Sequence, residues 1–298
     1  MNQPLFTNRN SPTQLVSSPV DRTLGKILID SGKLTPEGVE RIVEYQKERG
    51  LRFGEAALKL RLVTKRDLQY ALANQFGYDY LQEGEGDVSK DLVAAYEPFS
   101  QQAEALRSVR GQLILRKLGS HHKTLVILSP DQGEGRSYLA SNLAVVFSQL
   151  GENTLLIDAD LRTPRQHTIF NLENRVGLSS ILGGRAGFET IQHVPSFDNL
   201  SVLCAGATPP NPSELLCRTE FSRLLQALAD RYGVVIIDTP AGDANADAQS
   251  ITAQAGTARA IALMVIRKDH TRLKKAKSFM DDLKGTNVEI VGTVLNQF

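Results

Sequence analysis

The sequence has no tryptophan and only two cysteines among its 298 residues. Cys204 and Cys217 show no motif spacing and have no histidine close by in the sequence. This pattern argues against a disulfide framework and a zinc motif, and it predicts reduced, packed thiols in a cytosolic protein. The sequence also has no excess of either charge, since it contains 34 lysines and arginines and 33 aspartates and glutamates. Such a balanced chain gives no electrostatic reason to expect nucleic acid or an anionic membrane as its main partner.

Long apolar runs are also missing. No stretch approaches the roughly 20 apolar residues that cross a bilayer. Residues 1–20 are polar and rich in proline, serine and asparagine, unlike a signal peptide. We expect residues 1–18 to be a disordered tail, and we expect any role at a membrane to come through a partner.

Residues 24–75 repeat themselves with a period of 29. The recurring residues are Gly25, Thr35 and Gln46 as Gly54, Thr64 and Gln75, and apolar Ile27, Leu28, Leu34, Val39 and Ile42 as Ala56, Ala57, Val63, Leu68 and Ala71. Each copy predicts a short helix, a turn and a second helix opened by a threonine N-cap, with Pro36 supporting one start and Asp67 the other. Two such hairpins would bury their apolar faces on each other, so residues 19–80 are predicted to form a small all-α domain.

The pattern changes after residue 80. Residues 81–95 are acidic and contain glycine, which predicts a linker. Beyond it, segments of helical period separate short apolar runs at 125–128, 155–157, 200–203, 234–237, 261–266 and 290–295. Strands that are buried on both faces and alternate with helices predict a doubly wound, mostly parallel α/β sheet in residues 96–298.

A glycine-rich turn follows the first of these runs. It consists of Gly133, Glu134, Gly135, Arg136, Ser137 and Tyr138, and a helical segment comes directly after it. Backbone N–H groups at such a strand-to-helix turn bind phosphate. The spacing is that of a degenerate Walker A loop, because Arg136 stands where lysine is usual. By itself the turn is equally compatible with a plain strand–helix connection.

Carboxylates follow two further runs. Asp158 and Asp160 come at the end of the second run, and Asp238 comes at the end of the fourth. In a doubly wound sheet these positions lie at the edge that carries the phosphate loop. Mg²⁺ prefers hard oxygen ligands, so Ser137 and Asp238 are predicted to hold it. The alternative is that the aspartates only cap turns, but three of them beside a phosphate loop favour a metal–nucleotide site.

Together these motifs resemble the bacterial tyrosine kinase family, MinD-related P-loop proteins with a second motif of the form D-x-D-x-R. That motif stands here as Asp158, Asp160 and Arg162. Two further marks of the family are the segment 206–216, Gly-Ala-Thr-Pro-Pro-Asn-Pro-Ser-Glu-Leu-Leu, and the series Glu104, Arg107 and Arg110. The resemblance covers roughly residue 96 to the end, and it is greatest to the chain-length-determinant kinases of exopolysaccharide export.

The resemblance implies a MinD-like fold that binds ATP and Mg²⁺ and phosphorylates tyrosine. The implied catalytic residues are Arg136, Asp158, Asp160 and Arg162, and residues 133–138 with Asn296 would bind the nucleotide. Asp158 or Asp160 would accept the tyrosine proton. Glu104, Arg107 and Arg110 would join subunits into a ring. The implied partner is a membrane-embedded polysaccharide co-polymerase whose cytoplasmic tail activates the kinase, which would place this cytoplasmic protein at the inner membrane.

Two departures from the family pattern leave other functions open. Arg136 keeps the positive charge of lysine but not its compact ammonium. The last tyrosine is Tyr232, whereas the family's usual substrate is a tyrosine cluster at the C-terminus. A catalytically weak, nucleotide-gated assembly module of the export machinery is therefore an alternative, and so is a MinD- or ParA-type ATPase. The segment 206–216 and the lack of a C-terminal amphipathic helix count against the latter.

The N-terminal repeats resemble the tandem motifs of type II secretion and pilus ATPases, some of which bind cyclic di-GMP. Two positions depart from that pattern: Thr23 replaces an arginine and Arg61 replaces a glycine. Residues 19–80 are therefore predicted to be a docking or packing module, with cyclic di-GMP binding as the alternative.

Overall fold

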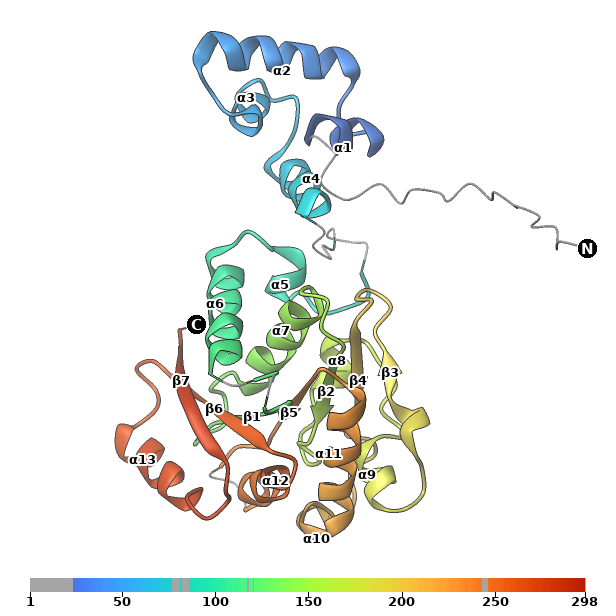
Figure 1. Ribbon diagram of the computed structural model, residues 1–298, viewed down its shortest axis with the longest axis vertical. Coiled ribbons are helices and arrows are strands. Elements are labelled where there is room, and N and C mark those ends of the chain that lie inside the picture. Colours follow the sequence, from blue (N-terminus) through green and yellow to red (C-terminus); the bar gives the residue numbers. More distant parts are fainter. Residues whose placement is uncertain are drawn as a thin grey trace, which may run out of the picture. The chain divides into compact units, whose positions relative to one another are not determined.

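The computed structural model describes residues 24–76, 81, 86–116, 118–119, 121–242 and 246–297. The chain divides into two compact units, Met1–Tyr78 and Asp79–Phe298 (Figure 1). The predicted tail, residues 1–18, lies outside the described residues. No helix in the described part of the chain is long and apolar enough to span a membrane.

The first unit contains the four helices that the repeat predicted. They are α1 (Leu24–Asp30), α2 (Pro36–Arg49), α3 (Phe53–Lys59) and α4 (Lys65–Phe76). Thr35 caps α2 by accepting a hydrogen bond from the Gly38 amide at 3.2 Å. Thr64 and Asp67 form a reciprocal capping box at the start of α4, with N–O distances of 2.8 and 3.1 Å,. Both predicted helix starts are confirmed.

The two repeats share one hydrophobic core. The buried residues are Ile27, Leu28, Leu34 and Ile42 from the first copy and Ala56, Ala57, Val63 and Ala71 from the second. The buried side chains of the first copy are thus larger than their equivalents in the second copy, and this difference in size allows close packing,. The copies also match in backbone conformation, because Gly32 and its equivalent Arg61 both have positive φ, 67° and 54°.

The second unit is built on one seven-stranded sheet of order β3-β4-β2-β5-β1-β6-β7. Its strands are β1 (Thr124–Leu128), β2 (Thr154–Asp158), β3 (Gln192–His193), β4 (Leu200–Leu203), β5 (Val234–Asp238), β6 (Ala260–Arg267) and β7 (Glu289–Asn296). All six predicted strands are present, and every pairing is parallel except that of β3 with β4. The sequence did not predict β3, because two polar residues give no alternating apolar pattern.

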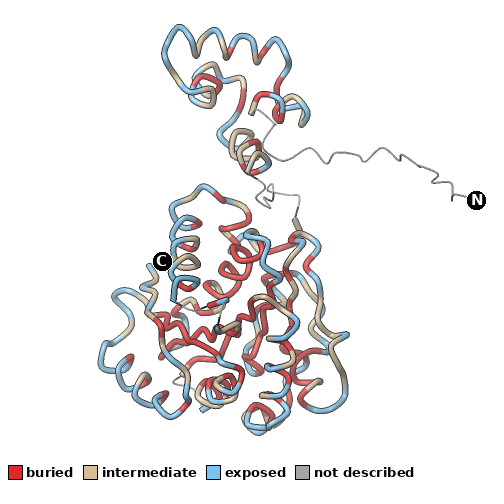
Figure 2. The backbone as a smooth tube through the Cα atoms, in the orientation of Figure 1, coloured by how far each residue is buried: buried red, intermediate tan, exposed pale blue. Residues whose placement is uncertain are grey.

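Helices cover both faces of this sheet (Figures 1 and 2). Along β1, Leu125 and Ile127 belong to one hydrophobic cluster, whereas Val126 and Leu128 belong to the other. The first cluster includes residues of α5 (Val93–Tyr96), α6 (Gln101–Leu115), α7 (Arg136–Ser148) and α8 (Gln166–Ile169). The second includes residues of α9 (Leu178–Leu182), α10 (Pro212–Cys217), α11 (Thr219–Arg231), α12 (Asp247–Gly256) and α13 (Leu273–Asp282). A short 3-10 turn, η2 (Phe188–Thr190), precedes β3. This is the doubly wound arrangement that the sequence predicted.

The segment that we predicted as a linker, 81–95, differs from that expectation in its later half. Leu92, Ala94 and Ala95 are fully buried in the first cluster of the second unit. Asn142 on α7 accepts a hydrogen bond from the Ala94 amide at 3.1 Å and donates one to the Asp91 carbonyl at 2.9 Å. The acidic, glycine-bearing start of the segment concealed this apolar stretch in the sequence.

Candidate nucleotide and phosphoryl-transfer site

The glycine-rich turn connects β1 to α7 at the carboxyl edge of the sheet. Gly133 and Gly135 have φ values of 78° and 92°, a region that side-chain-bearing residues rarely adopt. Gly135 is the N-cap of α7, and Ser137 and Tyr138 lie half-buried in its first turn. Burial, followed by the charges of Asp91 and Glu97, raises the pKa of Tyr138. The loop therefore has the backbone geometry that directs amides toward an anion at a helix start.

Arg136 is buried and bound to its own loop. Its Nε donates to the Thr239 carbonyl at 2.8 Å and its Nη1 donates to the Asp131 carbonyl at 3.0 Å. Nη1 also donates to the Ser129 hydroxyl. The guanidinium thus joins both ends of the loop to the segment that follows β5, a bracing role that a motif comparison with lysine does not reveal.

Glu134 ties the loop to two other strands. Its Oε2 accepts from the Asp131 amide at 3.0 Å, and its Oε1 accepts from the Thr271 hydroxyl, which follows β6. Asn296 on β7 donates to the Glu134 carbonyl at 3.1 Å. Lys275 on α13 forms an ion pair with Asp131. The structure therefore places Asn296 beside the loop and adds Thr271 and Lys275, which the sequence did not single out.

Asp158 and Asp238 lie side by side, because they are register partners on neighbouring strands β2 and β5. Both are fully enclosed. Burial raises the pKa of Asp158 well above its usual range, and the charges of Asp238 and Asp160 add to the rise. Hydrogen bonds from the backbone amides of Gln166 and Arg165 to Oδ2, at 2.9 and 3.0 Å, lower this pKa in part. The Asp160 amide donates to Oδ1 at 3.2 Å.

Asp238 has one carboxylate oxygen that accepts a hydrogen bond and one that does not. Its Oδ2 accepts from Nε2 of Gln166 at 2.7 Å, whereas its buried Oδ1 has no hydrogen-bond partner. Burial raises the pKa of Asp238, and the Arg136 charge, the Gln166 hydrogen bond and the nearby Ser137 hydroxyl lower it in part. Ser137 and Asp238, the predicted magnesium ligands, are therefore close to each other.

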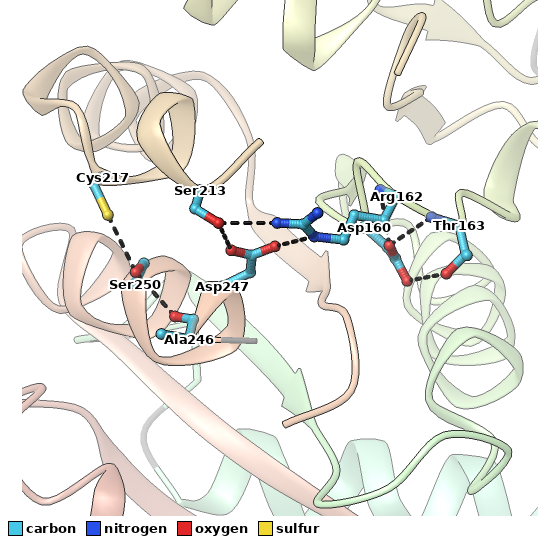
Figure 3. A network of polar contacts seen from close by, with 8 residues as sticks. All are labelled: Asp160, Arg162, Thr163, Ser213, Cys217, Ala246, Asp247 and Ser250. Atoms are coloured by element: carbon cyan, nitrogen blue, oxygen red, sulfur yellow. Dashed lines mark hydrogen bonds and ion pairs between the residues drawn. The ribbon is translucent and has the colours of Figure 1, made fainter. Parts of the chain in front are cut away.

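Figure 3 shows the surroundings of Asp160 and Arg162, which differ from those of Asp158 described above. Asp160 caps a turn: its Oδ1 accepts from the amides of Arg162 and Thr163 at 3.1 and 2.8 Å, and its Oδ2 accepts from the Thr163 hydroxyl at 2.8 Å. The turn-capping role, the alternative for these aspartates, is thus present at Asp160, which retains 7% exposure.

Arg162 reaches away from that turn to two residues that the sequence did not assign. Its Nε donates to Oδ2 of buried Asp247 at 2.8 Å, and its Nη2 donates to the Ser213 hydroxyl at 3.0 Å (Figure 3). Ser213 in turn donates to Oδ1 of Asp247 at 2.5 Å. Ser213 belongs to the 206–216 segment, so the structure joins two family motifs through Asp247 at the start of α12.

The three residues predicted to join subunits lie on α6, but they differ in accessibility. The side chain of Glu104 is 70% exposed and lies 3.4 Å from Nη1 of Arg107, which is only 11% exposed. Arg110 donates to the Val146 carbonyl on α7 of its own chain. Of the three, Glu104 is the side chain that most faces solvent.

Among the described residues, no group of three or more His, Cys, Asp or Glu side chains is arranged to hold a metal ion. A magnesium ion at Asp238 and Ser137 would therefore depend on phosphate oxygens and water for its remaining ligands, as Mg²⁺ commonly does.

Known proteins are similar to this chain in sequence and in fold. No family model matches the chain. The tyrosine-protein kinase YwqD of Bacillus subtilis is 36% identical over 209 residues, which cover 70% of this chain and 86% of the relative. The kinase domain of Escherichia coli tyrosine kinase ETK superposes with a TM-score of 0.65 at 33% identity, covering 69% of this chain and 79% of that domain. The Pyrococcus furiosus cell division ATPase MinD superposes with a TM-score of 0.51 at 26% identity, covering 60% and 72%. The protein therefore belongs to the bacterial tyrosine-protein kinases, on a MinD-like P-loop fold.

Proposed function

We propose that the second unit binds Mg·ATP at residues 133–138 and phosphorylates protein tyrosines, as an autokinase that regulates exopolysaccharide chain length and export. The observation that carries this proposal is the buried, unpartnered Oδ1 of Asp238 beside Ser137 and the phosphate loop. A buried acceptor without a donor costs about 1–3 kcal/mol, and a hydrated cation would satisfy it. The residues present therefore fit a magnesium–nucleotide site.

The chain's own residues divide the work. Bound Mg·ATP would supply the phosphoryl group and neutralise part of its charge. The amides of the glycine-rich turn would hold the phosphates, and Asn296 would line the nucleotide site next to Glu134. Of the two candidate proton acceptors, Asp160 has exposed surface and Asp158 has none. We therefore assign Asp160 to the tyrosine proton, with Asp158 organising the segment through its three backbone amide contacts.

The metal–nucleotide assignment is tested with Asp238→Ala. Mg·ADP should raise the melting temperature of the wild type, because a ligand that binds only the native state stabilises it by mass action. The variant should lose the part of the shift that depends on magnesium and keep the part seen in EDTA. Equal shifts in wild type with and without magnesium would contradict the proposal.

A catalytically weak regulatory module is the second candidate function. It is favoured by Arg136, whose guanidinium is bound to the carbonyls of Thr239 and Asp131. Purified protein incubated with ATP, with and without the cytoplasmic tail of a polysaccharide co-polymerase, should become phosphotyrosine-positive if it is a kinase. Appending a tyrosine-rich tail gives a substrate in cis. If that tail stays unphosphorylated although ATP binds, the protein is a regulatory module and not a kinase.

For cellular context, we propose a cytoplasmic protein held at the inner membrane by a membrane-embedded polysaccharide co-polymerase. We also propose that α6 joins subunits into a ring through Glu104, Arg107 and Arg110. Because Arg110 contacts α7 of its own chain, Glu104→Lys is the cleaner test. It should lower the mass seen by light scattering with ATP and the co-polymerase tail present, and an unchanged mass would count against the ring.

For residues 19–80 we propose a docking or packing module, with cyclic di-GMP binding as the alternative. Arg61 occupies the left-handed position that Gly32 holds in the first repeat, so the second repeat presents a long cationic side chain where the related ATPase motif has none. Calorimetric titration of the full chain with cyclic di-GMP distinguishes the two. Heat that saturates at one ligand per chain would select the alternative.

A further inference from the structure

Gln166 connects the three parts of the site. It begins α8 and is fully buried. Its side-chain Nε2 donates to Oδ2 of Asp238 at 2.7 Å and to the Ser137 carbonyl at 3.2 Å. Its backbone amide donates to Oδ2 of Asp158 at 2.9 Å. One residue therefore touches the phosphate loop and the carboxylates at the ends of β5 and β2.

The orientation of the Gln166 amide follows from these partners. Both side-chain contacts are to acceptors, a carboxylate and a carbonyl oxygen, so the NH₂ group must face them and Oε1 must point elsewhere. That Oε1 is buried and has no hydrogen-bond partner, and neither has Oδ1 of Asp238. Two adjacent, hydrogen-bonded side chains thus each keep one unsatisfied oxygen. Such a pair of acceptors suits the donor hydrogens of cation-bound water.

From this geometry we propose that Gln166 is a positioning residue for the metal–nucleotide site, a role that rests on the proposed function. Its Nε2 occupies one oxygen of Asp238 and thereby presents the other to the metal shell. Because the same nitrogen also holds the Ser137 carbonyl, it fixes the spacing between the two predicted ligands. The backbone contact to Asp158 extends this support to the D-x-D-x-R segment. Partners of this kind, which orient a metal ligand, typically contribute about 10–100-fold to metal affinity.

A purely structural role predicts something different. If Gln166 only fills space, its loss should lower the stability of the protein without changing how nucleotide binding depends on magnesium. Gln149 offers a matched control, since it is a part-buried glutamine that donates to the Ala94 carbonyl at 3.0 Å near the end of α7. The same substitution at Gln149 removes a comparable side chain at the opposite end of α7 from Ser137.

The experiment measures the ADP-induced rise in melting temperature of the full chain as Mg²⁺ is titrated, for wild type, Gln166→Met and Gln149→Met. We expect Gln166→Met to raise the half-effective Mg²⁺ concentration by about tenfold or more, with the shift seen in EDTA unchanged. Gln149→Met should titrate like wild type. Gln166→Asn, whose amide is too short to reach both acceptors, should move in the same direction and serves if the methionine variant does not fold.

The outcomes separate the two proposals. A wild type that responds equally with and without magnesium overturns the proposed function and this inference with it. A wild type that depends on magnesium, with Gln166 variants that titrate identically to it, overturns only the positioning role. If Gln149→Met raises the half-effective Mg²⁺ concentration as well, the effect reflects a general loss of stability. That result would also overturn the positioning role of Gln166.

Discussion

Replacing Arg136 with lysine tests whether this arginine braces the phosphate loop. In the wild type the guanidinium binds three acceptors, the carbonyls of Thr239 and Asp131 and the hydroxyl of Ser129. Thr239 and Ser129 are fully buried. A lysine ammonium is a single point donor on an unforked chain, so it cannot reach the acceptors on both sides of the loop. At least one buried acceptor loses its donor in Arg136→Lys.

The size of the effect follows from that loss. A buried acceptor left without a donor costs about 1–3 kcal/mol, and we take about 2 kcal/mol for the variant as a whole. In a domain of about 150–250 residues each kcal/mol lowers the melting temperature by roughly 2–4 °C. We therefore expect Arg136→Lys to melt about 4–8 °C below wild type, measured without nucleotide by calorimetry. Arg116→Lys is the control, because Arg116 is exposed and its side chain donates to the Val291 carbonyl at 3.0 Å.

The same variant should change catalysis in the opposite direction. A lysine freed from the loop carbonyls can place its compact charge against the transferring group, and one well-placed group of this kind is worth on the order of 10²–10³ in rate. We expect ATP affinity to stay within about tenfold while phosphotyrosine formation or ATP hydrolysis rises. If Arg136→Lys lowers the melting temperature no more than the control Arg116→Lys does, the bracing role is refuted. A destabilised variant that is no faster refutes the catalytic expectation and favours a site rebuilt around arginine or an ATP-sensing module.

Three further predictions address other parts of the chain. Arg61→Gly should stabilise the first unit by about 1 kcal/mol, because glycine adopts positive φ without the Cβ penalty; slower amide exchange in α3 and α4 checks this, and Arg61→Ala should give no gain. Asp247→Asn should weaken its hold on Arg162 and lower phosphotyrosine formation, and a double-mutant cycle with Arg162→Ala should give a coupling of about 1 kcal/mol, whereas additive effects would contradict the contact. The third prediction concerns pH: because the folded pKa values of Asp158 and Asp238 lie above the ordinary 3.8, the folded chain holds protons that the unfolded chain releases. These groups should therefore cost stability as pH rises from about 4 toward the folded values. Melting temperature in the absence of nucleotide should fall less steeply with pH in Asp238→Asn than in wild type, and parallel curves would refute the assignment.

Local patterns in the sequence were sufficient for most of the fold. A strand buried on both faces is a continuous apolar run, and a helix start has a cap residue, so both signals lie within a few neighbouring residues. The repeat in residues 24–75 likewise predicted the four helices and their shared core, because equal spacing implies equal structure. The same reasoning missed β3, which is only two residues long. It also took the buried apolar stretch ending at Ala95 for part of a linker, because acidic and glycine-bearing residues precede it.

The sequence by itself determined which chemical groups the site contains, and the tertiary structure decided how they are connected. Glycines, a hydroxyl and carboxylates after strands already indicated a phosphate and metal site. The contacts of Gln166 with Asp238 and of Arg162 with Asp247 join residues 72 and 85 positions apart, and Thr271 reaches Glu134 across 137. Such pairings depend on the strand order β2-β5-β1-β6, which brings distant loops to one edge of the sheet. No local periodicity carries that information, so only the folded chain shows that Arg136 braces the loop and that Asp238 keeps one oxygen unpaired.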